Sequence, residues 1–271
     1  MRRITNFPTD VAFGRDGTVF VLLRTEGAAL IRVWSIDDAE QLTGDLVQIG
    51  GYGTGDGQFQ WPVQLVCNED GDLFVSDEAT HRITRFKEDG EFVSKWGTEG
   101  SGPGEWKGPA GIAFDPEGNL VVVDSQNHRV QRFTANGEYL GAFGSYGSDP
   151  GQFDLPMGVH VDELGDIYVA DWGNERVQIL GPDGSFQVLL QGEATVSKWA
   201  DDYFASNPEE KVERDNANLM PALPDHLSSP YHVSSQTESY FWGPVSVSLD
   251  GAGRLYVTET NRHRFQVYQK Q

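Results

Sequence analysis

The sequence predicts an all-β propeller, because one segment of 47 residues recurs along the chain and each copy has the pattern of four short strands. Pro62, Pro109 and Pro156 stand 47 residues apart, and each opens a near-copy of the same segment. A single four-stranded sheet cannot bury both of its faces, so it needs a neighbour on each side. We therefore expect the copies to pack as blades that start near residues 8, 62, 109, 156 and 244.

The copy that begins at Pro109 shows the four strands most clearly. Two short apolar runs flank a turn at residues 116–119 and predict a hairpin. An alternating third run and a fourth run follow, each after a further turn. The predicted strands are residues 111–115, 120–124, 128–133 and 139–143, and the same order recurs from 64 to 96 and from 158 to 190.

The interval from Pro156 to Pro244 spans 88 residues, nearly two periods, so the number of blades needs a separate argument. Residues 192–240 lack the strand and turn order of the repeat, and they place Val196, Trp199 and Tyr203 at helical spacing. We therefore favour five blades over six, with 192–240 as a helical and irregular lid inserted into a single domain of residues 1–271.

The last copy ends at its third strand, residues 265–268. A propeller closes its ring when a strand from elsewhere completes the last blade, which also removes an exposed sheet edge. Residues 3–7 at the start of the chain are the candidate for this fourth strand.

Several motifs of the repeat resemble those of a known family. Gly-Gln-Phe precedes two of the prolines (57–59 and 151–153), and Asp-x-x-x-His-Arg occurs at 77–82 and 124–129. These motifs resemble NHL repeats over residues 7–190 and 243–268. The chain departs from the pattern at Glu175, where the family prefers His, and at Arg24, near the usual Asp.

The resemblance implies an NHL-type β-propeller, and it leaves two functions open. Propellers that resemble this one include binding modules and also lyases and calcium-dependent lactonases. These enzymes use one His, Asp, Asn or Glu from each of several blades at the axis. Against an enzyme, the sequence contains no Gly-x-Ser-x-Gly, no His-Glu-x-x-His and no phosphate-binding loop.

Composition excludes several classes of partner. The net charge of −21 argues against nucleic acid, because phosphate recognition depends on clustered Lys and Arg. Cys67 is the single cysteine, so neither an intrachain disulfide nor a thiolate metal cluster is expected. No apolar stretch has the length of a signal peptide or a membrane span, so we expect a soluble, cytoplasmic protein without a membrane partner.

Topology places a candidate site at one end of the propeller. The turns between second and third strands, the loops before the prolines and the 192–240 insertion all fall at the same end, which we call the top face. Loops on a rigid scaffold carry function, and a lid over a mouth excludes water. We therefore expect a small molecule or a protein to bind at the central mouth of the top face, under the lid.

The candidate catalytic residues are His160, Asp10 and Glu259. His160 replaces a small or apolar residue of the other copies and is expected near the axis, where it could act as a base. His160 and Asp10 are also the candidate ligands of a divalent metal at the axis; the alternative is a hydrogen-bonded histidine without chemistry. The candidate ligand-binding residues are Gln64, Asp171, Trp172, Ser246, His226 and Tyr231.

Overall fold

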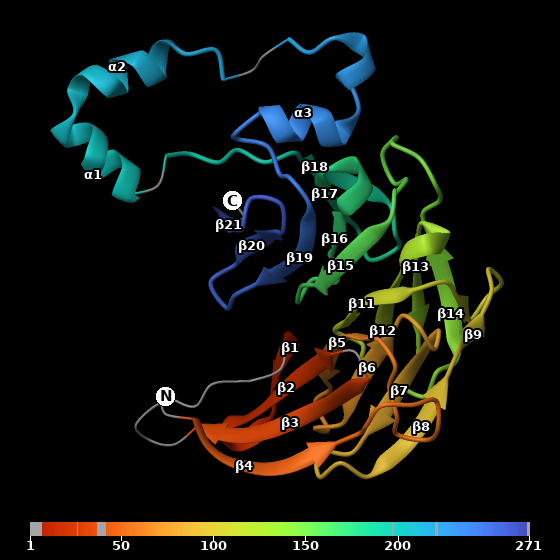
Figure 1. The fold of residues 1–271 in the computed structure, drawn as a ribbon. Helices are drawn as coiled ribbons and strands as arrows, with labels where there is room; N and C mark the ends of the chain where they lie inside the picture. Colours follow the sequence, from red (N-terminus) through yellow and green to blue (C-terminus); the bar gives the residue numbers. More distant parts are fainter. Residues whose placement is uncertain (1–6, 26, 37–41, 197, 220–221, 270–271) are drawn as a thin grey trace.

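The computed structural model describes residues 7–25, 27–36, 42–196, 198–219 and 222–269. It confirms a propeller of five blades, arranged as an arc around one axis (Figure 1). In each blade the strands are antiparallel and follow one another from the axis outward. Blade 1 contains β1 (Pro8–Phe13), β2 (Thr18–Thr25), β3 (Ala28–Ile36) and β4 (Leu42–Ile49), with η1 (Arg15–Gly17) between β1 and β2.

The next three blades repeat this order. Blade 2 contains β5 (Pro62–Cys67), β6 (Leu73–Asp77), β7 (Arg82–Phe86) and β8 (Phe92–Trp96). Blade 3 contains β11 (Pro109–Phe114), β12 (Leu120–Asp124), β13 (Arg129–Phe133) and β14 (Tyr139–Phe143), with the short pair β9 (Thr98–Glu99) and β10 (Glu105–Trp106) before it. Blade 4 contains β15 (Pro156–Val161), β16 (Ile167–Asp171), β17 (Arg176–Leu180) and β18 (Phe186–Leu190).

Blade 5 contains three described strands, β19 (Pro244–Leu249), β20 (Arg254–Glu259) and β21 (Arg264–Gln269). The expected fourth strand, residues 3–7, falls mostly outside the described residues. Within them, the carbonyl of Phe7 accepts a hydrogen bond from the amide of Arg24 in β2, so this residue lies along blade 1. The arc is open between blades 1 and 5 (Figure 1).

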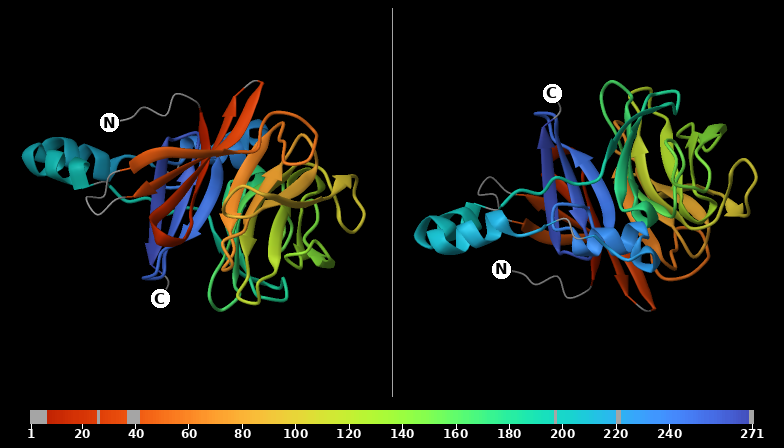
Figure 2. Two further views of the ribbon diagram at one scale, coloured as in Figure 1. Left: turned by 90° about the horizontal axis from the view of Figure 1, so that it is seen from below. Right: turned by 90° about the horizontal axis from the view of Figure 1, so that it is seen from above.

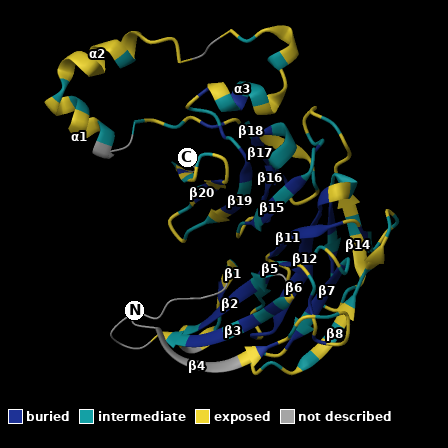
Figure 3. Ribbon diagram, viewed as in Figure 1, coloured by how far each residue is buried: buried dark blue, intermediate teal, exposed yellow. Residues whose placement is uncertain are grey.

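Apolar side chains from neighbouring blades form the core. Between blades 2 and 3, Phe74, Ile83 and Ile112 are buried in one cluster, and similar clusters lie at the other junctions (Figure 3). Burial of one such side chain stabilises a fold by roughly 1.5–3 kcal/mol. The repeat therefore determines both the strands within each blade and the apolar contacts between neighbouring blades.

The insertion between β18 and β19 contains α1 (Lys198–Ser206), α2 (Pro208–Asn216), η4 (Asp225–Leu227) and α3 (Pro230–Gln236). Both views in Figure 2 show α1 and α2 extending beyond blade 5, away from blades 2 and 3. By contrast, α3 contacts η3 (Trp172–Asn174), the turn between β16 and β17 on the top face of blade 4. None of the described helices has the length and apolar character that crossing a membrane requires.

Two sets of hydrogen bonds hold the ends of the insertion against blade 5. Its ends are held together where Phe241 N–H donates to the carbonyl of Gln191 (2.8 Å) and Ala194 N–H donates to Ser239 (3.0 Å). The Arg264 guanidinium in β21 then donates to the carbonyls of Glu238 and Tyr240. Arg82, Arg129 and Arg176 hold the shorter connections of the other blades in the same way.

Candidate functional site

A buried acid at the end of each second strand organises the top of blades 2 to 5. In blade 4, Asp171 accepts hydrogen bonds from the amide of Asp154 (2.7 Å) and from the side chains of Asn174 and Arg176. In blade 5, Glu259 accepts from the amide of Trp242 (2.9 Å) and from Arg264 (2.7 Å). These two predicted site residues are therefore engaged in holding the loop of their own blade.

The histidines of the Asp-x-x-x-His-Arg motif join one blade to the next. His81 and His128 have left-handed backbone conformations, with φ of 51° and 54°. Their Nδ1 atoms accept hydrogen bonds from the amides of Gly108 (3.3 Å) and Leu155 (3.1 Å) at the start of the following blade. Glu175 takes this position in blade 4, where its carboxylate accepts from the amide of Gly243. Burial raises the pKa of Glu175 to about 7.

Asp10 and Gln64 join the inner strands in a similar way. The Asp10 carboxylate accepts from the amide of Leu65 (2.8 Å), and Gln64 Oε1 accepts from the amide of Ile112 (2.8 Å). Burial raises the pKa of Asp10 to about 6, although the Leu65 hydrogen bond opposes this. Ser246 has the same place two residues after a proline in blade 5, and it is exposed at the open end of the arc.

His160 lies between blades 4 and 5, near the end of the axis opposite the top face. It pairs with Tyr168 across the sheet, whereas Pro156 pairs with Asp171 at the top end of the same two strands. The imidazole packs edge-on against the Tyr168 ring, with centroids 6.5 Å apart. Burial lowers the pKa of His160, and the nearby Asp162 carboxylate opposes that shift. The imidazole is therefore neutral near pH 7 and able to accept a proton.

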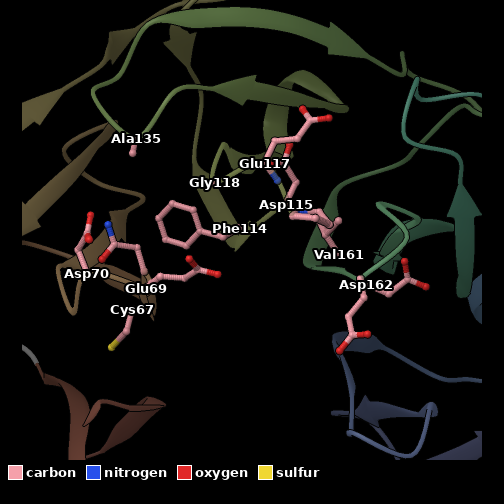
Figure 4. A pocket seen from close by; sticks show the side chains of 13 residues that line it. Cys67, Glu69, Asp70, Phe114, Asp115, Glu117, Gly118, Ala135, Val161 and Asp162 are labelled. Atoms are coloured by element: carbon pink, nitrogen blue, oxygen red, sulfur yellow. The ribbon is translucent and has the colours of Figure 1, made fainter.

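A large cavity lies at this opposite end, which we call the bottom face. Its volume is about 590 Å³, and the turns between first and second strands of blades 2, 3 and 4 line it. Figure 4 shows Glu69 and Asp70 together on one side of the opening. Glu117 of blade 3 lies on a second side, and Asp162 lies across the opening from Glu69. Phe114, Val161 and Cys67 supply apolar surface in the same cavity. A second cavity of about 370 Å³ adjoins it, shares Val161 and Asp162, and reaches His160.

Acids dominate the first cavity. Its six carboxylates belong to Glu69, Asp70, Asp115, Glu117, Asp162 and Glu163, and no Lys or Arg occurs among the described residues that line it. Three of the six have partners: Asp115 pairs with Arg132 (3.3 Å), Asp162 accepts from the amides of its own turn, and Glu117 accepts from the side-chain amide of Asn119 (3.3 Å). Glu69, Asp70, Glu117 and Glu163 are exposed and give the mouth its negative charge.

The predicted residues of the insertion lie at the top face instead. Tyr231 in α3 packs edge-on against Trp242, with centroids 5.6 Å apart, while Trp172 is half-buried in the turn that α3 contacts. His226 is exposed in η4. The structure thus brings Trp172 near α3, but it does not bring this group together with His160 on the bottom face.

The predicted metal ligands do not fit a metal centre. His160 lies near the bottom of blade 4, and the Asp10 carboxylate is directed to the backbone of Leu65 in blade 2. Among the described residues, no group of three or more His, Cys, Asp or Glu side chains could hold an ion. We therefore derive no chemistry from a metal at the axis.

The acidic bottom turns are the feature that sequence reasoning missed. Residues 68–70, 115–117 and 162–163 are visible in the sequence, where they indicate ordinary turns. The signal that they lie together is their common place in the repeat, since corresponding turns meet at one end of a propeller.

Comparison with known proteins supports the fold and adds two enzymes with a similar architecture. A family model for the NHL repeat matches residues 153–180 and 241–268, and a model for a 6-bladed beta-propeller matches residues 59–144. No curated protein sequence matches the chain.

Among solved structures, a streptogramin B lyase is similar at 12% identity and a TM-score of 0.55, covering 99% of this chain and 70% of that one. A gluconolactonase from Xanthomonas campestris is similar at 16% identity and a TM-score of 0.57, covering 94% and 70%. A protein of unknown function from Bacteroides thetaiotaomicron is similar at 18% identity and a TM-score of 0.61, covering 98% and 60%. At these identities the likeness concerns the fold.

Proposed function

This chain belongs to the NHL-repeat β-propeller family, and from that premise we propose that it is a binding propeller whose axial cavity takes a cationic ligand. The ligand would be an organic amine or guanidinium, either free or as the Lys or Arg side chain of a partner protein. The observation that carries the proposal is the cavity of about 590 Å³ on the bottom face, with its six carboxylates.

The size and chemistry of this cavity suit such a ligand. Ligand pockets generally occupy about 300–1,000 Å³ and combine apolar walls with a few polar groups. Here Phe114 and Val161 can contact the alkyl chain of the ligand. Glu117 and Glu163 can accept hydrogen bonds from its ammonium or guanidinium group. A concave surface of one charge also concentrates oppositely charged ligands, so the net charge of −21 favours encounter.

This mouth is at the other end of the propeller from the one that the sequence analysis favoured. The top face remains the second possible mouth for a binding propeller, because α3 covers part of blade 4 there. The bottom face is preferred because its cavity is lined by three blades around the axis.

A matched pair of triple variants tests the proposal with a fluorescein-labelled lysine–glycine peptide as probe. We expect Glu69→Gln, Glu117→Gln and Glu163→Gln together to weaken binding several-fold, because each removes a carboxylate from the cavity. The control, Glu138→Gln, Glu209→Gln and Glu213→Gln, makes the same change in charge on exposed residues elsewhere and should retain binding. If both triple variants lost affinity equally in fluorescence anisotropy titrations, peptide binding would depend only on net charge, contrary to the proposal.

An enzyme is the second candidate, and His160 is the observation that favours it. A neutral imidazole that lines a cavity of about 370 Å³ beside a carboxylate is suited to act as a general base. The similar lyase and gluconolactonase make a lactone the first substrate to try. Ring opening that resists a chelator, is lost in His160→Gln and persists in His226→Gln would support an acid–base enzyme; no turnover would remove this candidate.

A further inference from the structure

The outer edge of β21 lies open along a groove. In blades 1 to 4 a fourth strand pairs with the third, whereas among the described residues β21 pairs only with β20. The groove measures about 560 Å³ and is lined by Arg264, Phe265, Gln266, Val267 and Tyr268 of β21. Since successive residues of a strand point to opposite faces, a groove lined by all five runs along the edge itself.

Elements of the insertion form the other wall of this groove. Ala200 and Phe204 of α1, Arg214 of α2 and the segment 193–196 face β21 across it. The wall is fixed in place, because the amide of Glu193 donates to Tyr268 Oη (2.8 Å) and Arg214 pairs with Glu238 (2.9 Å). The insertion thus stands beside the edge of β21 and leaves a gap between them.

A second cavity flanks the same edge on the side towards blade 4. It measures about 570 Å³ and lies between Leu189, Leu190, Tyr240 and Tyr268. In the preceding blades an aromatic residue at the start of the fourth strand fills the corresponding place: Phe92 packs on Phe86 (6.2 Å between centroids), and Tyr139 packs on Phe133 (5.8 Å).

We propose that this edge binds an extended segment of another protein, which adds to β21 as the fourth strand of blade 5. Strand addition of this kind takes affinity from backbone hydrogen bonds and specificity from pockets for alternate side chains. Both are present here, as the edge of β21 along residues 264–268, with which no described strand pairs, and the two cavities beside it.

The other blades define the register and side chains of this segment. Phe86 pairs with Phe92 and Ile83 with Trp96; likewise Phe133 pairs with Tyr139 and Val130 with Phe143. By its place in the repeat, Tyr268 corresponds to Phe86 and Phe265 to Ile83. The segment should therefore run antiparallel to β21, with an aromatic residue opposite Tyr268 and a large apolar residue four positions later opposite Phe265.

Phe265 and Val267 lie on the face of β21 that is turned away from blade 4, and they are 64% and 47% exposed. Ile83, the counterpart of Phe265 in blade 2, is instead buried with Ile112 of the next blade. Both exposed side chains are therefore accessible to the side chains of an added strand. An apolar residue at the third position of the segment would lie opposite Val267, as Val188 lies opposite Ile179 in blade 4.

Peptides copied from the fourth strands of this chain provide the test. Labelled peptides of residues 90–97, 137–144 and 184–191 are titrated into the full chain, and at least one should bind saturably. In the peptide 90–97, Ser94→Pro removes a backbone donor from the strand and should abolish binding. Binding should also slow hydrogen exchange of the amides in residues 264–268.

Two exposed phenylalanines give a matched pair of protein variants. Phe265→Lys places a charge in the groove and should weaken peptide binding several-fold, whereas Phe13→Lys, on a residue 68% exposed in blade 1, should not. The proposal is overturned if none of the three peptides binds, or if Phe265→Lys and Phe13→Lys bind equally. It is also overturned if peptide binds only after residues 1–6 are deleted, which would assign the edge to the chain's own N-terminus, or if the peptide competes with self-association of the chain.

Discussion

Glu175 shows how one residue changes the junction between two blades. Its counterparts His81 and His128 accept an amide hydrogen bond through a ring nitrogen, and Glu175 accepts the corresponding bond through a carboxylate. The sequence identified Glu175 as a departure from the repeat, but its consequence depends on burial. The carboxyl is nearly inaccessible and lies near Glu259, which also raises its pKa.

Replacement of Glu175 by Gln should remove part of the pH dependence of stability. Its pKa is raised from 4.5 to about 7 in the folded chain, so its contribution to stability is full below about pH 4.5 and is lost as pH rises through 7. We expect Glu175→Gln to have a melting temperature close to wild type at about pH 5 and a higher one at about pH 8.

The control for this experiment is Glu117→Gln, which changes an exposed carboxylate at the other end of the propeller. It should shift the melting temperature little at either pH. A Glu175→Gln variant that loses the same stability at both pH values would show that the carboxylate does not titrate in this window.

At the scale of single elements, the inner strands approach one another very closely. A Cβ on Gly111 of β11 would lie 2.6 Å from the carbonyl oxygen of Met157 and 2.8 Å from the amide nitrogen of Val159 in β15. The backbone of β15 cannot retreat without disturbing its own pairing with β16. The proline spacing predicts the repeat of the inner strands, but the close contact between them depends on how the blades pack.

We therefore expect Gly111→Ala to destabilise the chain by about 1–3 kcal/mol, the usual range for overpacking a tight site. Gly141→Ala in β14 is the matched control, since a Cβ there has no neighbour within 4 Å. Urea denaturation should separate the two variants clearly. Equal stability would mean that the inner strands can move apart at low cost.

The secondary structure of the insertion was easier to predict than its position on the propeller. The sequence predicts helices within 192–240, and the described residues of this segment form three α-helices. It also suggested a lid over the central mouth, because the insertion connects strands at the top face. The Glu193 hydrogen bond places the first part of the insertion beside β21, and the Arg264 anchor places its last part there. Such long-range contacts have no local signature in the sequence.

At the scale of the whole molecule, the repeat explains why the fold was predictable. Each blade repeats the same strand order and the same contacts with its neighbour, so three near-copies suffice to identify the architecture. The cavity on the bottom face differs because it arises from turns that are distant in sequence and meet only when the blades curve around the axis. His160 was identified by its departure from the repeat, yet its neighbours on the bottom face were not.

Hydrogen–deuterium exchange of the full chain, with and without the lysine–glycine peptide, tests the proposed cationic ligand most directly. The bottom-face cavity predicts slower exchange in residues 67–70, 114–118 and 161–163, which line it, and little change in 225–237. Protection confined to residues 225–237 and the top turns, or no protection at all, would contradict binding at the acidic bottom mouth.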